Sequence, residues 1–127
     1  MFRQGPLPPL IHGVLDYLVA GALIAAPFAL DFSSDTATAT AVALGLALLL
    51  AAASADLPTA VVHSVPRALH ALVDYAIALA LVAAPFVLDF TGDDRAAPAF
   101  VAIGAVQLMQ TLATRFLKPK HTPRAAR

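Results

Sequence analysis

Two histidine–aspartate pairs are the residues of this chain whose types and spacing could do chemistry. His12 precedes Asp16 by four positions, and His70 precedes Asp74 by the same interval. Residues four apart lie on one face of a helix, so the members of each pair can meet. A histidine titrates near neutral pH, and imidazole and carboxylate groups are both ligands for transition metals. The pairs therefore point to proton handling, metal binding or polar helix packing.

Four interpretations of the pairs follow from these properties. Each pair can satisfy its own hydrogen bonds and fix the packing between segments, as buried polar groups usually do. The pairs can belong to a proton or ion pathway, because ionisable groups inside a membrane are often functional. The four side chains can form one metal site if their segments are adjacent, or the two histidines can ligate a haem. We adopt the packing interpretation, and we expect neither a cofactor nor a bound metal.

A third polar group lies near the end of the chain. Gln107, Gln110, Thr111 and Thr114 are separated by three or four positions and so share one helical face. Gln110 and Thr114 lie about as far from the end of their apolar run as His70 and Asp74 lie from the end of theirs. The spacing thus allows a hydrogen-bonded cluster of Asp74, His70, Gln110 and Thr114. We expect Asp74 to contact at least one of the other three side chains, or the pair His12 and Asp16 of the first repeat. The candidate site then comprises His12, Asp16, His70, Asp74, Gln110 and Thr114.

The segments that must position these residues are four apolar runs, at 10–30, 38–55, 68–88 and 96–117. Each has about the 20 residues that a helix needs to cross a bilayer. A backbone in lipid must satisfy its own hydrogen bonds, which predicts that the runs are helices. The run 38–55 contains no charged residue and has no polar face for water, which argues against a soluble bundle.

The composition agrees with a membrane protein. Of the 127 residues, 60% are apolar and 13% are charged, with a mean hydropathy of +0.80. Soluble domains carry about 25% charged residues. The formal net charge is zero, so no basic face is available for nucleic acid, and the absence of cysteine excludes thiolate chemistry. Motifs of phosphate-binding loops, serine hydrolases and zinc proteases are missing, and we expect that the protein is not an enzyme.

The basic residues predict an orientation. With four spans, the N-terminal segment, the middle loop and the C-terminal tail share one side, which carries seven of the eight lysines and arginines. The positive-inside rule places that side in the cytoplasm, with the protein in the cell inner membrane. The turns on the other side contain five aspartates that we expect in solvated loops, among them Asp31, Asp89 and Asp93.

The chain contains an internal repeat. Residues 10–32 are identical to residues 68–90 at 13 of 23 positions, including the histidine, aspartate, proline and phenylalanine positions. Each copy contains two spans, so both copies insert in the same direction, related by a pseudo-twofold axis along the membrane normal. We therefore expect an all-α bundle of four transmembrane helices, built from two parallel helical hairpins, with spans 10–30 and 68–88 near each other. At a spacing of 58 residues, the counterparts of Gln107, Gln110 and Thr111 are the apolar Leu49, Ala52 and Ala53.

These features divide the chain into five parts. We expect a cytoplasmic segment 1–9, repeat 1 at 10–57, a cytoplasmic loop 58–66, repeat 2 at 67–117 and a basic cytoplasmic tail 118–127.

The hairpin motif resembles the SPW-repeat family of bacterial integral membrane proteins. Each copy has an acidic residue early in its first helix, then a small residue, proline and an aromatic residue, then an apolar-x-Phe exit. The Ser-Pro-Trp motif that names the family is replaced by Ala26-Pro27-Phe28 and Ala84-Pro85-Phe86, and the chain has no tryptophan. The resemblance covers about residues 8–117. It implies a topology of two-helix units and no particular activity.

The sequence thus predicts a small integral membrane protein with a non-catalytic structural or accessory role. Its expected partners are the lipid bilayer and either a second copy of the chain or another membrane protein, with no nucleic acid. One alternative is a minimal ion- or proton-coupled transporter or channel that uses Asp16 and Asp74. The other alternative is a membrane protein with a histidine-ligated metal or haem.

Overall fold

The computed structural model describes residues 8–54, 61 and 66–114, and its regular elements in this part of the chain are four helices. They are α1 (Pro9–Ala29), α2 (Asp35–Ser54), α3 (Arg67–Val87) and α4 (Ala96–Ala113). All four are long and apolar enough to cross a membrane, which confirms the predicted spans. The tail 118–127 lies outside the described residues, as do most of the predicted segments 1–9 and 58–66.

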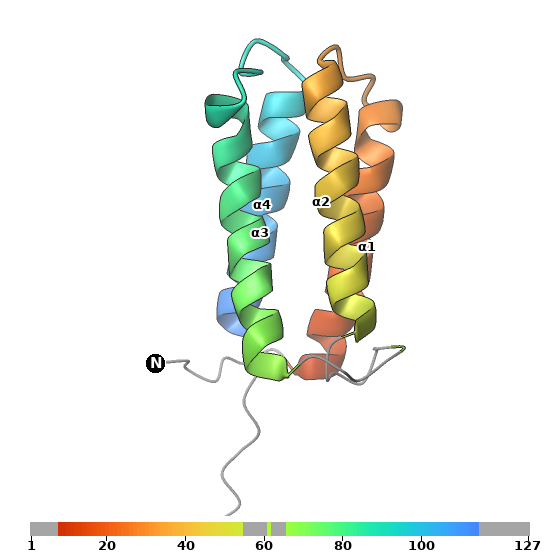
Figure 1. Ribbon diagram of the computed structural model, residues 1–127, viewed down its shortest axis with the longest axis vertical. Coiled ribbons are helices and arrows are strands. Elements are labelled where there is room, and N and C mark those ends of the chain that lie inside the picture. The colour runs from red at the N-terminus through yellow and green to blue at the C-terminus, as the bar shows by residue number, and fades with distance from the viewer. Residues whose placement is uncertain (1–7, 55–60, 62–65, 115–127) are drawn as a thin grey trace, which may run out of the picture.

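The helices form two hairpins, α1–α2 and α3–α4, that stand side by side (Figure 1). Between the hairpins, α1 packs beside α4 and α2 packs beside α3, whereas the backbones of α1 and α3 make no contact. The two helices therefore lie across a diagonal of the bundle. Figure 1 shows α1 and α3 starting at the same end of the bundle. Spans 1 and 3 consequently meet only through side chains that reach the bundle axis.

Equivalent positions in α2 and α4, the second helices of the two hairpins, are separated by 59 residues rather than 58. Their buried positions pair as Ala37 with Ala96, Ala41 with Phe100, Gly45 with Gly104, Leu48 with Gln107, and Ala52 with Thr111. We predicted Leu49 as the counterpart of Gln107, and this prediction is wrong. The Leu49 side chain is partly exposed, whereas Leu48 is buried and takes the equivalent place. The reason is one additional residue in the turn before α4. The equivalents of Gln110 and Thr111 become Ala51 and Ala52.

The first helix of each hairpin ends in the same way. Pro27 and Pro85 lie in the last turns of α1 and α3. The N–H of Phe32 donates to the carbonyl of Pro27 at 3.0 Å, and Phe90 repeats this contact with Pro85 at 2.9 Å. Such a bond closes a helix around a left-handed residue, and Asp31 takes that position with φ 54°. Aspartate tolerates this conformation better than most residues because its side chain is short and polar.

Asp93 joins the two hairpins at the end of the bundle where both turns lie. Its Oδ2 accepts hydrogen bonds from the backbone N–H groups of Ser33 and Ser34, both at 2.9 Å. Its Oδ1 accepts from the N–H groups of Arg95 and Ala96 at 3.1 and 3.0 Å. The expectation of a solvated loop residue is wrong for Asp93, which is only 6% exposed. Four backbone donors replace water around the carboxylate.

The same contacts set the charge state of Asp93. Burial alone would raise its pKa, but the hydrogen bonds from the backbone of Ala96, Ser34 and Arg95 lower the pKa from 3.8 to about 2. The carboxylate is therefore ionised at neutral pH, and it stabilises the start of α4, where the helix dipole favours negative charge.

Candidate functional site

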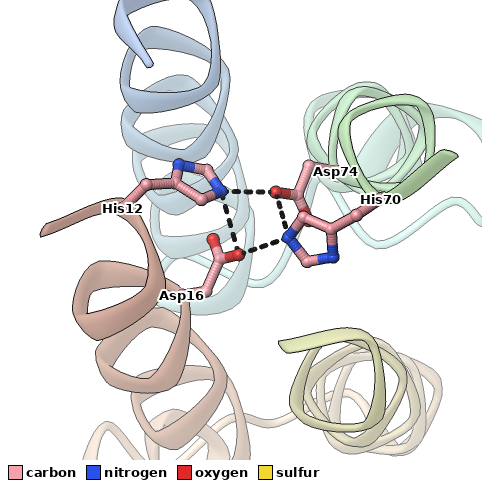
Figure 2. A group of neighbouring side chains, drawn as sticks. All are labelled: His12, Asp16, His70 and Asp74. Carbon is pink, nitrogen blue, oxygen red and sulfur yellow. Dashed lines mark hydrogen bonds and ion pairs between the residues drawn. The ribbon is translucent and has the colours of Figure 1, made fainter. Parts of the chain in front are cut away.

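Four side chains meet on the bundle axis: His12 and Asp16 from α1, and His70 and Asp74 from α3 (Figure 2). We call this group the polar ring. All four side chains are 0% exposed. Because histidine and aspartate are one turn apart on each helix, both side chains point to the same side. The diagonal placement of α1 and α3 then aims the two pairs at each other.

The ring alternates nitrogen and oxygen atoms. His12 Nε2 lies 2.7 Å from Asp74 Oδ2 and 3.0 Å from Asp16 Oδ2. His70 Nε2 lies 3.0 Å from both of these oxygens. Hydrogen bonds cross between the helices, from His12 to Asp74 and from His70 to Asp16. The ring therefore links the first repeat to the second, rather than each pair being satisfied alone.

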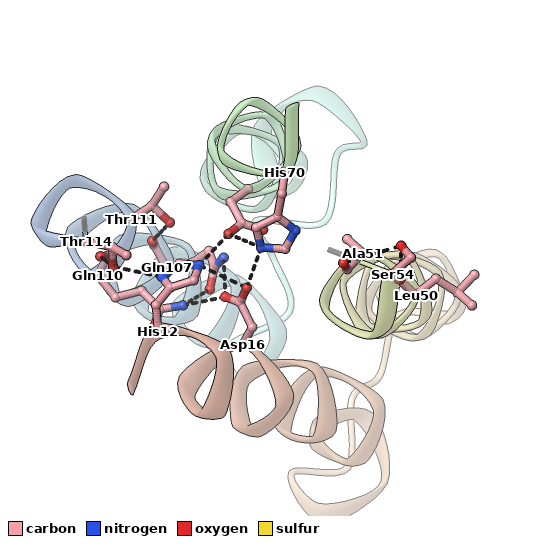
Figure 3. Close-up of polar contacts among 11 residues, drawn as sticks. His12, Asp16, Leu50, Ala51, Ser54, His70, Gln107, Gln110, Thr111 and Thr114 are labelled. Carbon is pink, nitrogen blue, oxygen red and sulfur yellow. Dashed lines mark hydrogen bonds and ion pairs between the residues drawn. The ribbon is translucent and has the colours of Figure 1, made fainter. Parts of the chain in front are cut away.

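Helix α4 supplies an outer layer of polar contacts (Figure 3). Gln107 and Gln110 donate their side-chain N–H groups to Asp16 Oδ1 at 3.2 and 2.9 Å. Thr114 Oγ1 lies 2.9 Å from His12 Nδ1. The side chains of Gln107, Gln110 and Thr114, the residue that follows α4, are all buried.

The six candidate residues come together, and Asp74 contacts His12 and His70, which are among its expected partners. In the cluster that the spacing allowed, Gln110 and Thr114 would contact His70 and Asp74 of their own repeat. They contact Asp16 and His12 instead, because α4 packs beside α1 as well as beside α3 and turns its polar face across the hairpin boundary.

Gln107 belongs to the site but was not among the six candidates. It is fully buried and bonds directly to Asp16. Its position three residues before Gln110 on the same helical face was the signal that could have found it. Thr111 lies on that face as well, but its hydroxyl donates to the carbonyl of Gln107 within α4.

The two aspartates have unequal surroundings. Asp16 uses both oxygens, since Oδ2 faces the histidines and Oδ1 accepts from two glutamines. Asp74 Oδ1 has no hydrogen-bond partner in the described part of the chain, although it is buried. The cause lies in α2, where the equivalents of the two glutamines are Leu48 and Ala51.

The geometry limits the chemistry of the site. A haem does not fit between His12 and His70, because Asp16 and Asp74 each place an oxygen within 3.0 Å of both Nε2 atoms. The ring atoms can hold protons or a single small cation.

Comparison with known proteins identifies the family. The SPW repeat domain matches residues 10–114, which include both hairpins and all ring residues. No curated protein and no solved structure matches the chain. The matched region covers most of the chain and coincides with the four apolar helices. The chain therefore belongs to the SPW repeat domain family.

Proposed function

We propose that this protein is a non-catalytic structural or accessory component of the cell inner membrane, in which contacts within the polar ring hold the two hairpins together. We call this role of the ring the clasp. The observation that carries the proposal is that the ring is closed by two residues from each hairpin, at distances of 2.7–3.0 Å. In this arrangement the N- and C-termini are cytoplasmic, as the distribution of lysines and arginines favours.

The clasp interpretation is supported by how the hairpins otherwise meet. Their helices are apolar, and lipid is as apolar as they are, so burial of apolar surface contributes little to helix association in a membrane. Polar contacts between helices supply specificity instead. Only one relative position of α1 and α3 brings each histidine to the opposite aspartate. We infer that the ring fixes the register of the hairpins.

The bilayer is the partner that the outer surface favours. Many large apolar side chains on the helices are exposed outward, such as Leu18, Phe28, Leu50, Phe86 and Met109. On the described helices, this surface suits lipid or another membrane protein, including a second copy of the chain, rather than nucleic acid. The full burial of Asp16 and Asp74 favours a clasp over the transporter alternative, because transported ions must enter and leave such a site continuously.

The clasp is tested by comparing Asp74→Leu with Asp94→Leu in purified protein in detergent. Removing one partner of a buried ion pair costs about 3–5 kcal/mol, since the remaining charges are left uncompensated. Asp94 is exposed, and replacing it should change the free energy of unfolding by less than about 0.5 kcal/mol. Equal stability of the two variants would contradict the clasp.

A second measurement separates the clasp from ion transport. Wild-type protein in liposomes containing a pH-sensitive dye should pass protons no faster than liposomes without protein. Proton entry that Asp74→Asn abolishes, while the variant remains folded, would favour the transporter alternative.

A further inference from the structure

We propose that the polar ring is a binding site for one divalent first-row transition-metal ion, held by His12 Nε2, His70 Nε2 and the Oδ2 atoms of Asp16 and Asp74. The proposal rests on the clasp described above and adds the ion that closes it. It can fail while the clasp stands, since the clasp needs only contacts among the side chains.

The first argument is the number of hydrogen atoms in the ring. Each Nε2 lies within 3.0 Å of two carboxylate oxygens, which makes four close contacts. An imidazole nitrogen carries at most one hydrogen. With both carboxylates ionised, two hydrogens at most therefore serve four contacts. One cation at the centre contacts all four atoms at once.

The second argument is the hydrogen bonding of His12. The Thr114 hydroxyl has one hydrogen, and it donates that hydrogen to the carbonyl of Gln110. At 2.9 Å, Thr114 Oγ1 must then accept from His12 Nδ1–H. A neutral His12 consequently presents the lone pair of Nε2 to Asp74 Oδ2, at 2.7 Å. Two acceptors so close need a cation between them, or a proton on either the imidazole or the carboxyl group.

The third argument is geometry. All four ligand atoms lie within 4.8 Å of one another. Metal–ligand bonds of about 2.0–2.1 Å place neighbouring ligands about 2.9 Å apart in a square plane and about 3.3 Å apart in a tetrahedron. The ring contacts of 2.7–3.0 Å match the distances between neighbouring ligands in the square arrangement.

Charge and ligand type select the class of ion. Two neutral imidazoles and two carboxylates carry a charge of −2, which one divalent cation balances without leaving net charge in the membrane. Imidazole ligands favour zinc, copper, nickel or iron, whereas magnesium and calcium require more oxygen ligands.

The surrounding contacts are those of a supported metal site. Ligating histidines usually donate their second N–H to a fixed acceptor, and ligating carboxylates are themselves hydrogen-bonded. Thr114 serves His12 in this way, and the glutamines of α4 serve Asp16. The buried Asp74 Oδ1, without a partner in the described residues, is a further oxygen available to the ion.

The experiment measures metal bound to the full chain, purified in detergent through an affinity tag that contains no histidine. Wild type and variants are stripped with a chelator, incubated with zinc, copper, nickel, cobalt, manganese or iron(II) salts, desalted and analysed for metal per protein. We expect about one equivalent of at least one of these metals in wild type. Asp74→Asn should lose it, because the amide has nearly the volume of the carboxylate but binds metal weakly.

The control removes the other two histidines of the chain, His63 and His121, as a double alanine variant. This variant should retain the full equivalent.

If Asp74→Asn does not fold, bound copper(II) in wild type provides the second measurement, since its paramagnetic resonance spectrum should show coupling to two nitrogen nuclei. No more than trace binding of every metal in wild type would overturn the proposal. Loss of metal in the control, or a copper spectrum without nitrogen coupling, would overturn it as well.

Discussion

At the residue scale, the site is held by partners that cross between repeats. The sequence predicted that Asp74 and His70 belong to a polar cluster, because ionisable residues inside an apolar helix need partners. It could not predict that Gln110 would bond to Asp16, since that depends on which helix stands beside α4. Spacing along one helix shows which side chains share a face, whereas the partner across the interface is decided by packing.

The unequal surroundings of the two aspartates lead to a prediction about Leu48. This residue occupies in α2 the place that Gln107 occupies in α4, and it is fully buried. In Leu48→Gln, the new amide should donate to Asp74 Oδ1, as Gln107 donates to Asp16 Oδ1. An unsatisfied buried acceptor costs about 1–3 kcal/mol, so this bond should offset much of the cost of burying the amide.

The matched control is Leu81→Gln, which places the same amide at a fully buried apolar position. Unfolding in detergent should show Leu48→Gln to be the more stable variant by at least about 1 kcal/mol. If the two substitutions lower the free energy of unfolding equally, Asp74 Oδ1 does not need a hydrogen-bond donor.

At the element scale, the apolar runs predicted the helices within a few residues of their ends, because a membrane span has a required length and the prolines mark its limits. The register between α2 and α4 was not predictable from the repeat. The single additional residue lies in a turn whose sequence differs between the copies, and an offset of one residue turns a helix by about 100°. Burial of Leu48 rather than Leu49 is the consequence.

Close packing within each hairpin leads to a prediction about glycines. A Cβ added at Gly45 would lie 2.8 Å from Ile24 Cγ1 and 3.1 Å from the carbonyl oxygen of Ala20, whereas at Gly21 it would meet nothing within 4 Å. Gly45→Ala should therefore destabilise the protein by separating α1 from α2. Gly21→Ala should stabilise it by about 0.5–1 kcal/mol, since alanine favours the helix.

Unfolding of the two variants in the same detergent checks this pair. Gly104→Ala provides a repetition in the second hairpin, where the added Cβ would lie 2.8 Å from Val82 Cγ2. Stabilisation by Gly45→Ala would show that α1 and α2 are not in close contact at this point.

At the scale of the whole molecule, the hairpins are joined at two levels. The polar ring joins them near the starts of α1 and α3, and Asp93 joins them at the opposite end of the bundle. The sequence predicted the first junction from its residue types. It did not predict the second, because a turn rich in aspartate, glycine and threonine is typical of a solvated loop.

The outer junction should depend on pH. The pKa of Asp93 is lowered to about 2 by the backbone hydrogen bonds, from 3.8 for the unperturbed group. A lowered pKa stabilises the folded state fully above 3.8, and this contribution is lost as the pH falls towards 2. Asp93→Asn should therefore melt below wild type at neutral pH, and the difference should shrink between about pH 4 and pH 2.

Thermal unfolding in a non-ionic detergent across this range measures the effect. Asp94→Asn, which removes an exposed neighbouring charge, should follow the wild-type curve at every pH. A difference between Asp93→Asn and wild type that stays constant down to pH 2 would mean that ionisation of Asp93 is not its source.

The position of the whole molecule in the membrane is the remaining prediction. Seven of eight lysines and arginines belong to the side that holds the termini and the middle loop, so the turn containing Asp94 should face the outside of the cell.

The chain has no cysteine, which allows single cysteines to report topology without background. In intact cells with a permeabilised outer envelope, a membrane-impermeant thiol reagent should label Asp94→Cys. It should label Thr122→Cys only after lysis, because that residue belongs to the basic tail that the positive-inside rule holds in the cytoplasm. The reverse labelling pattern would place the basic segments outside and contradict the orientation.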